Sequence, residues 1–235
     1  MAPRPVRAFA FVLVAALAAA ACSDSEDAGP TFTVDLGQGA IEVQTVDGLA
    51  DAAGVVDTVV MVGDSITKGS LPALESRFAD LGLDAAIVAD NGKRMAVAAS
   101  NNPSGVDVTA FLAADESRDR AREVWVIALG TNDAGQYSSA DQYAAAVNAV
   151  LAEVPDDAAL VWVDTYIANR TDDTDEVNRV IHERVRRRGN AAIVPWSVVA
   201  PGPGVLSGDA VHPTAAGAEV FATLVADSVA TFVGR

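Results

Sequence analysis

The chain has 235 residues, of which 51% are hydrophobic and 20% are charged, and its formal net charge at pH 7 is −16. This composition is that of an ordinary globular chain with one good core, and it excludes a disordered or collagen-like protein. The excess of acidic side chains argues against nucleic acid as a partner, because a polyanion is repelled by an acidic surface. The single cysteine, Cys22, excludes disulfide bonds within the chain.

Residues 1–21 have the layout of a signal peptide. Arg4 and Arg7 precede a continuous apolar run that is short for a membrane span, which needs about 20 residues. The run ends at residues 19–22, Ala-Ala-Ala-Cys, which resemble a bacterial lipobox. The resemblance implies cleavage before Cys22 and lipid attachment to its thiol, and an unlipidated secretory signal is the alternative. We therefore expect an exported protein of the cell envelope that is tethered to the membrane through Cys22.

The segment that follows has the composition of a flexible tether. Residues 23–30 consist mainly of Ser, Asp, Glu, Gly and Pro, which cannot bury enough apolar surface to fold. We expect residues 22–50 to form a lipid-anchored tether and an irregular segment. Residues 51–235 are then expected to form one folded domain.

Strand and helix patterns alternate through this domain. Five short apolar runs predict buried strands at residues 55–62, 85–89, 124–129, 160–163 and 191–194. Apolar side chains at helical spacing follow several of them, at Leu74 and Phe78, at Tyr143, Val147 and Val150, at Val177, Ile181 and Val185, and at Val220, Phe221 and Leu224. This order predicts an α/β fold with a doubly wound, mostly parallel sheet of about five strands and helices on both faces. Sites in such folds lie at the carboxyl ends of the strands.

Polar motifs follow three of these strands. Gly63-Asp64-Ser65 ends the first strand and places Ser65 at or near the start of the next helix. Asn91-Gly92 follows the second strand, and Gly130-Thr131-Asn132-Asp133 follows the third. Taken alone, each motif is explained by helix capping or turn chemistry.

One histidine is a candidate base. Asp209 precedes His212 by three residues, a spacing that lets the carboxylate orient the ring and stabilise its charged form. His182 lies on a predicted helix close to three consecutive arginines, so we interpret it as a solvated surface residue.

In this order the motifs resemble the blocks of the SGNH hydrolase family, also called GDSL hydrolases, over residues 55–232. The resemblance implies a flavodoxin-like SGNH fold. It also implies a catalytic triad of Ser65 as nucleophile, His212 as base and Asp209 as the third member. The oxyanion hole that it implies consists of the backbone N–H groups of Ser65 and Gly92 and the side-chain amide of Asn132.

The expected chemistry is that of a serine esterase. A serine hydroxyl is a weak nucleophile unless a neighbouring base takes its proton, and a developing oxyanion needs fixed donors such as a glycine N–H or an asparagine amide. We expect hydrolysis of small acyl or acetyl esters, including carbohydrate esters, through an acyl-enzyme. No metal or cofactor is expected, because the sequence has no paired cysteines and no ligand-spaced carboxylate cluster.

Two alternatives use the same sequence features: an O-acyltransferase with the same site, and a catalytically silent surface-binding lipoprotein. Residues 93–95 and 100–105 either line the substrate pocket or serve as connecting loop.

Overall fold

A computed structural model describes residues 29–37, 39–51 and 54–235. The predicted signal peptide and Cys22 lie outside the described residues. One sheet of seven strands has the order β1-β2-β7-β6-β5-β3-β4. The strands are β1 (Thr31–Asp35), β2 (Ala40–Thr45), β3 (Thr58–Gly63), β4 (Asp84–Ala89), β5 (Glu123–Ala128), β6 (Ala159–Val163) and β7 (Ala191–Val194). The helices are α1 (Ser65–Gly69), α2 (Leu71–Asp80), α3 (Gly105–Ala113), α4 (Ala140–Leu151), α5 (Thr171–Arg188), α6 (Trp196–Val199) and α7 (Ala215–Phe232), with a 3-10 turn at Arg120–Arg122.

The predicted α/β class and parallel sheet are confirmed. Strands β4, β3, β5, β6 and β7 pair in parallel, and they correspond to the five predicted apolar runs. Every residue of β5, β6 and β7 is buried, as expected for strands that are covered on both faces.

The predicted number of strands, about five, is wrong. Residues 31–45, which the composition assigned to an irregular segment, form an antiparallel hairpin of β1 and β2, and β2 pairs antiparallel with β7. Each hairpin strand alternates apolar and polar residues, because one face packs on the core and the other does not. Such half-buried strands lack the continuous apolar runs that reveal the central strands.

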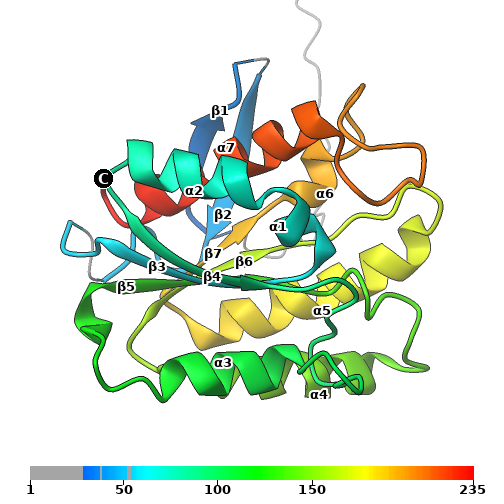
Figure 1. Ribbon diagram of the computed structural model, residues 1–235, viewed down its shortest axis with the longest axis horizontal. Coiled ribbons are helices and arrows are strands. Elements are labelled where there is room, and N and C mark those ends of the chain that lie inside the picture. Colours follow the sequence, from blue (N-terminus) through cyan, green and yellow to red (C-terminus); the bar gives the residue numbers. More distant parts are fainter. Residues whose placement is uncertain (1–28, 38, 52–53) are drawn as a thin grey trace, which may run out of the picture.

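The helices cover the two faces of the sheet as separate layers (Figure 1). Helices α2 and α7 lie on one face, and α3, α4 and α5 lie on the other. The side chains between them form two apolar clusters, one on each face. Helix α7 is long and apolar enough to cross a membrane by length and composition, but 56% of it is buried inside the protein, and its buried apolar side chains belong to the first cluster.

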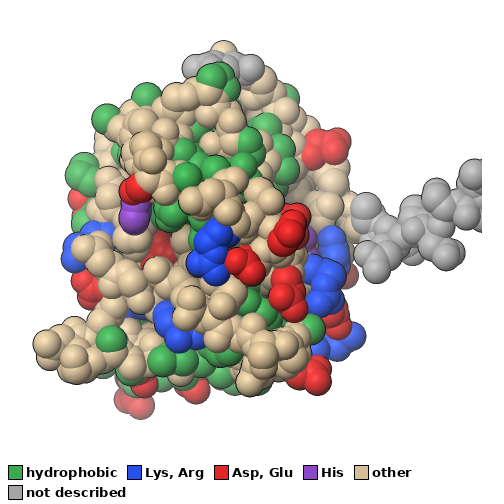
Figure 2. Space-filling view, turned by 90° about the vertical axis from the view of Figure 1, so that its right-hand side faces the viewer, with side chains coloured by type: hydrophobic (Ala, Val, Ile, Leu, Met, Phe, Trp, Pro, Cys, Tyr) green, Lys and Arg blue, Asp and Glu red, His purple; other side chains and the backbone are tan. Residues whose placement is uncertain are grey.

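The carboxyl ends of the parallel strands gather at one edge of the molecule, the right-hand side of Figure 1. Figure 2 looks onto this edge, where hydrophobic side chains gather in the upper part and charged side chains of both signs spread across the middle and lower parts. The three polar motifs that follow predicted strands lie at this edge, because β3, β4 and β5 belong to the parallel set.

Candidate active site

Ser65 is positioned by a tight turn between β3 and α1. Gly63 ends β3, and a Cβ atom there would overlap the buried side chain of Thr67. Asp64 then caps α1, because its Oδ1 accepts a hydrogen bond from the backbone N–H of Ile66 at 2.9 Å. The strand therefore turns into the helix within one residue and holds Ser65 at the first position of α1.

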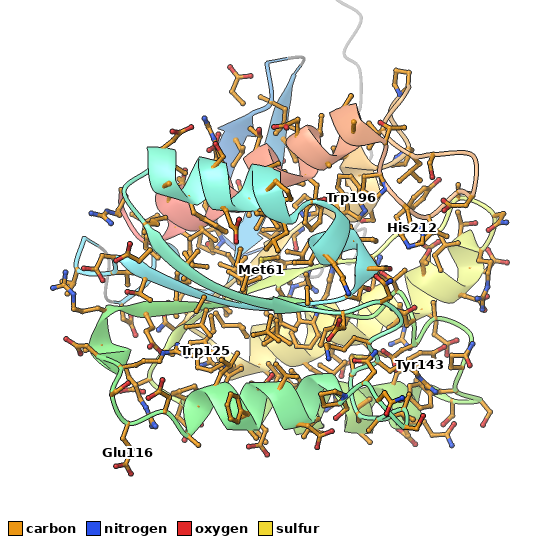
Figure 3. The ribbon with its side chains drawn as sticks, in the orientation of Figure 1. Met61, Glu116, Trp125, Tyr143, Trp196 and His212 are labelled. Carbon is orange, nitrogen blue, oxygen red and sulfur yellow. The ribbon has the colours of Figure 1, made fainter. Side chains whose placement is uncertain are left out.

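A chain of hydrogen bonds joins Ser65, His212 and Asp209. His212 Nε2 lies 2.9 Å from Ser65 Oγ, and its Nδ1 lies 2.7 Å from Asp209 Oδ2. The structure thus brings together three residues that the sequence places in two motifs 144 or more positions apart. His212 comes from the loop between α6 and α7, at the strand-end edge that Figure 3 shows on its right.

The loop that carries His212 is organised around Asp209. Its Oδ1 accepts hydrogen bonds from the backbone N–H groups of Val211 at 3.0 Å and His212 at 2.9 Å, and from Ser207 Oγ at 2.9 Å. The backbone and side-chain hydrogen bonds from His212, followed by those from Val211 and Ser207, hold the pKa of Asp209 well below its ordinary value. Ala210 has a positive φ of 67°, which turns the chain between the acid and the imidazole. Asp209 therefore stays charged and fixes the ring.

Gly92 and Asn132 line the same cleft as Ser65. Gly92 follows β4 with φ of 70°, a conformation that favours glycine. The Asn132 amide donates to Asp64 Oδ2 at 3.3 Å and to the backbone carbonyl of Lys93 at 3.2 Å. Both hydrogen bonds are long, so neither holds the amide strongly.

These groups border one open cleft of about 420 Å³. The cleft is lined by Ser65, Lys68, Gly69, Asn91, Gly92, Asn132, Val211 and His212. Most of the lining is polar or small, and Val211 is its one branched aliphatic side chain. The cleft therefore combines a hydrogen-bonded serine with polar donors and little apolar wall.

The loop after Gly92 turns away from this cleft. Lys93 is buried, and its Nζ donates to Asn102 Oδ1 at 3.0 Å and to the Pro103 carbonyl at 2.7 Å. Of the two segments considered from the sequence, residues 93–95 and 100–105, neither contributes to the lining of the cleft. The two segments form a connecting loop that is held together by its own hydrogen bonds from Lys93 to Asn102 and Pro103.

Asp133 has a positioning role that the sequence analysis did not recognise. Its carboxylate is fully buried and accepts hydrogen bonds from the Met95 backbone N–H at 2.9 Å, from Arg94 Nε at 3.2 Å and from Tyr137 Oη at 3.2 Å. Burial raises its pKa, and the hydrogen bonds from Met95 and Arg94 oppose that shift. Asp133 thereby fixes the loop next to Gly92. Its position directly after Asn132 was the only signal in the sequence.

Asp64 is a second buried carboxylate under the serine. Its side chain is 1% exposed, and burial raises its pKa to about 6 against the hydrogen bond from Ile66 and the nearby His212. A buried carboxyl group with a pKa near 6 is often found in a functional site. The same carboxylate also caps α1, so it both fixes the start of the helix and contributes to the electrostatic potential near Ser65.

His182 lies away from the cleft and is not the solvated surface residue that the sequence suggested. Its Nε2 lies 3.3 Å from Asp164 Oδ2, and its side chain is 26% exposed. The interpretation was wrong because α5 turns this position toward Asp164 at the end of β6, whereas the nearby Arg187 is exposed. Across the described ranges, no group of three or more His, Cys, Asp or Glu side chains is arranged to hold a metal ion.

The sequence and the fold both have known relatives. A model of the family described as "GDSL-like Lipase/Acylhydrolase family" matches residues 61–220. No curated protein matches the chain.

Three solved structures illustrate the likeness of the fold. The C-terminal catalytic domain of Streptococcus pneumoniae peptidoglycan O-acetyltransferase A has a TM-score of 0.57 at 19% identity, covering 76% of this chain and 96% of that one. TesA has a TM-score of 0.56 at 22% identity, covering 74% and 99%. A carbohydrate acetylesterase family member from Sinorhizobium meliloti has a TM-score of 0.56 at 14% identity, covering 77% and 100%. At these identities the likeness shows the shared fold.

The raised pKa of Asp64 predicts a pH-dependent cost to stability. Between its ordinary value of 3.8 and about 6, the native state holds a proton that the unfolded chain has released. The free energy of unfolding therefore falls as pH rises through this window, by on the order of 3 kcal/mol. Asp64→Asn cannot titrate, so we expect its stability relative to the parent protein to increase between pH 4 and pH 7. Urea unfolding at pH 4, 5, 6 and 7 measures the difference.

Asp80→Asn is the matched control, because Asp80 is exposed on α2 and the substitution changes the net charge equally. A difference between Asp64→Asn and the parent protein that stays constant across this pH range would contradict the raised pKa.

Proposed function

Because this chain belongs to the GDSL-like lipase/acylhydrolase family, we propose that it is a serine esterase that hydrolyses small acyl esters, acetyl esters among them. The observation that carries the proposal is the hydrogen-bond chain from Ser65 Oγ through His212 to Asp209 at the floor of an open cleft. A nucleophile, a base and a group that orients the base are the parts that acyl transfer to serine requires.

In the proposed reaction Ser65 Oγ attacks the ester carbonyl carbon while His212 Nε2 takes the hydroxyl proton. The charged Asp209 stabilises the resulting imidazolium through Nδ1. The tetrahedral intermediate expels the alcohol, which receives the proton from His212 and leaves an acyl group on Ser65. Water then attacks the acyl-enzyme with His212 as base, releasing the carboxylic acid and restoring the Ser65 hydroxyl.

We assign the oxyanion hole to the backbone N–H groups of Ser65 and Gly92 and to the Asn132 amide. The support is that all three residues border the same cleft. To bind the oxyanion, the Asn132 amide must redirect one of its N–H groups from Asp64 or Lys93. Both of those hydrogen bonds are long, so breaking one costs little free energy.

The lining of the cleft favours a short acyl group. A long acyl chain gains affinity by burying apolar surface, and a wall with one branched aliphatic side chain offers little of it. Acetyl and other short acyl groups have little apolar surface to bury, so the small apolar wall costs them little binding affinity. The polar residues of the cleft suit a hydroxyl-rich alcohol, such as a carbohydrate.

Exposure of the site favours hydrolysis over acyl transfer. The side chains of His212 and Asp209 are 47% and 51% exposed. A transferase has to keep water from the acyl-enzyme, whereas water reaches this imidazole directly. The silent binding module is disfavoured because a serine without a catalytic role has no need of an oriented imidazole at 2.9 Å.

The esterase proposal predicts activity on p-nitrophenyl esters that decreases with acyl length. We expect higher kcat/KM for the acetate and butyrate than for the octanoate and palmitate, because the cleft has little apolar wall. Ser65→Ala should lower kcat/KM by about 10³-fold or more. Stopped-flow or steady-state release of p-nitrophenol measures both effects.

Two results would contradict this assignment. Equal rates for the parent protein and Ser65→Ala would leave the binding-module alternative, and acyl transfer to an added alcohol without any hydrolysis would establish the transferase. A preference for the palmitate would overturn the short-acyl specificity.

The oxyanion assignment predicts a loss of turnover in Asn132→Ala. We expect kcat to fall by about 10²- to 10³-fold while KM changes little, as for removal of one oxyanion donor. The control is Asn148→Ala, an exposed position on α4. Unchanged kcat in Asn132→Ala, with an unchanged circular dichroism spectrum, would remove this amide from the site.

We further propose that the protein is exported and held at the membrane by a lipid on Cys22. The support is the charged start, the apolar run and the Ala-Ala-Ala-Cys sequence before the tether. In a bacterial host, Cys22→Ala should move the protein from the membrane pellet to the soluble fraction, whereas Ser23→Ala should stay in the pellet. Equal partition of the two variants would favour the unlipidated secretory signal.

A further inference from the structure

A second cavity, of about 470 Å³, lies between the β1–β2 hairpin and the junction of β7 with α6. We refer to it as the hairpin cavity. Its volume falls within the range of small-molecule sites, about 300–1,000 Å³. The hairpin lies outside residues 61–220, the part of the chain that matches the family.

The cavity exists because the hairpin extends the sheet beyond its cover of helices. On one face, Val34 and Val43 are buried in the cluster that includes α7. The opposite face carries the cross-strand pairs Thr31–Gln44 and Thr33–Glu42. On this face α5 forms a wall at the edge of the hairpin, where Arg186 donates to Gln44 Oε1 at 2.7 Å. The polar face of the hairpin is therefore left uncovered beside α5.

A buried carboxylate orients the imidazole that lines this cavity. Asp164 follows β6 directly, its side chain is 1% exposed, and it accepts hydrogen bonds from Ser197 N and Ser197 Oγ, each at 2.7 Å. His182 Nε2 lies 3.3 Å from the same carboxylate. Among the described residues no hydrogen bond engages His182 Nδ1 or the Glu42 carboxylate. Both groups are free to bind a ligand in the cavity.

The lining selects the chemistry of that ligand. It contains two carboxylates, those of Glu42 and Asp164, and no Lys or Arg side chain. An anionic ligand is repelled by such a site, while hydroxyl donors match its acceptors. Ile193, Pro195 and Val198 add an apolar wall. Sugar rings combine hydroxyl edges with C–H faces, and they fit both kinds of surface.

The hairpin cavity and the Ser65 cleft are both lined by residues at the carboxyl ends of the parallel strands. Ser65 follows β3, whereas Asp164 and Pro195 follow β6 and β7. The strand order places four to five strand spacings between β3 and the two hairpin strands, roughly 19–24 Å at about 4.8 Å per strand. A carbohydrate of several units can span that distance.

We propose that the hairpin cavity binds sugar units of an extended, uncharged carbohydrate whose ester group lies at Ser65. The connection to an ester depends on the proposed esterase function. Binding of the sugar units themselves depends only on the hairpin cavity, so the two proposals can fail separately.

The test is direct binding of oligosaccharides that carry no ester. Isothermal titration of the full chain with cellohexaose, xylohexaose and chitohexaose should show binding of at least one of them. Glu42→Ala and His182→Ala should each weaken that binding by about five- to tenfold, as expected for loss of one hydrogen-bonding partner. Glu75→Ala, on the exposed side of α2, is the control and should bind as the parent protein does.

Absence of binding by all three hexaoses, or equal binding by Glu42→Ala, would overturn the proposal. Glu42 lies on an exposed position of an edge hairpin, so its substitution tests the site without a buried partner. Tighter binding of hexagalacturonate or of a chitosan hexamer would replace the neutral carbohydrate with an anionic or a cationic ligand. Hexaose binding by a chain without esterase activity would retain this site and reject the proposed function.

Discussion

Buried carboxylates at the ends of the parallel strands hold this edge of the molecule together. Asp64, Asp133 and Asp164 follow β3, β5 and β6, which are neighbours in the sheet. Each one accepts a backbone N–H from a loop or helix start: Ile66, Met95 and Ser197 respectively. A buried carboxylate without such donors would cost several kcal/mol, so each aspartate requires its loop to stay in place. The loops around Ser65, Gly92 and the hairpin cavity are fixed by this one kind of interaction.

The arrangement also separates two electrostatic roles. Asp209 accepts four hydrogen bonds at the surface and stays ionised, so it can stabilise a charged imidazole. Asp64 lies beneath the serine, where burial favours its neutral form. The pKa values of two aspartates near one imidazole are thus shifted in opposite directions, upward by burial for Asp64 and downward by hydrogen bonds for Asp209. The one that faces solvent supports the base, and the buried one supports the backbone.

The central fold and the Ser65–His212–Asp209 group were accessible from sequence because each had a local signal. Continuous apolar runs marked the five parallel strands, and short motifs followed three of them. The hairpin lacked such a signal, since its alternation is brief and its flanks are polar. The partners of Asp133 and Asp164 are distant in sequence, at Met95 and His182. Sequence spacing does not fix such local contacts either: Ser139 and Gln142 have the spacing of a capping box, but the Gln142 side chain accepts from Ser138 instead.

The left-handed conformation of Ala210 determines when the loop that carries His212 loses its conformational freedom. An alanine with φ of 67° costs about 1–2 kcal/mol relative to its preferred conformations, a cost that glycine avoids. Alanine, however, has fewer conformations to lose than glycine when the loop becomes ordered. The entropy of orienting the imidazole is therefore lost when the chain folds, and it does not have to be lost again each time a substrate arrives.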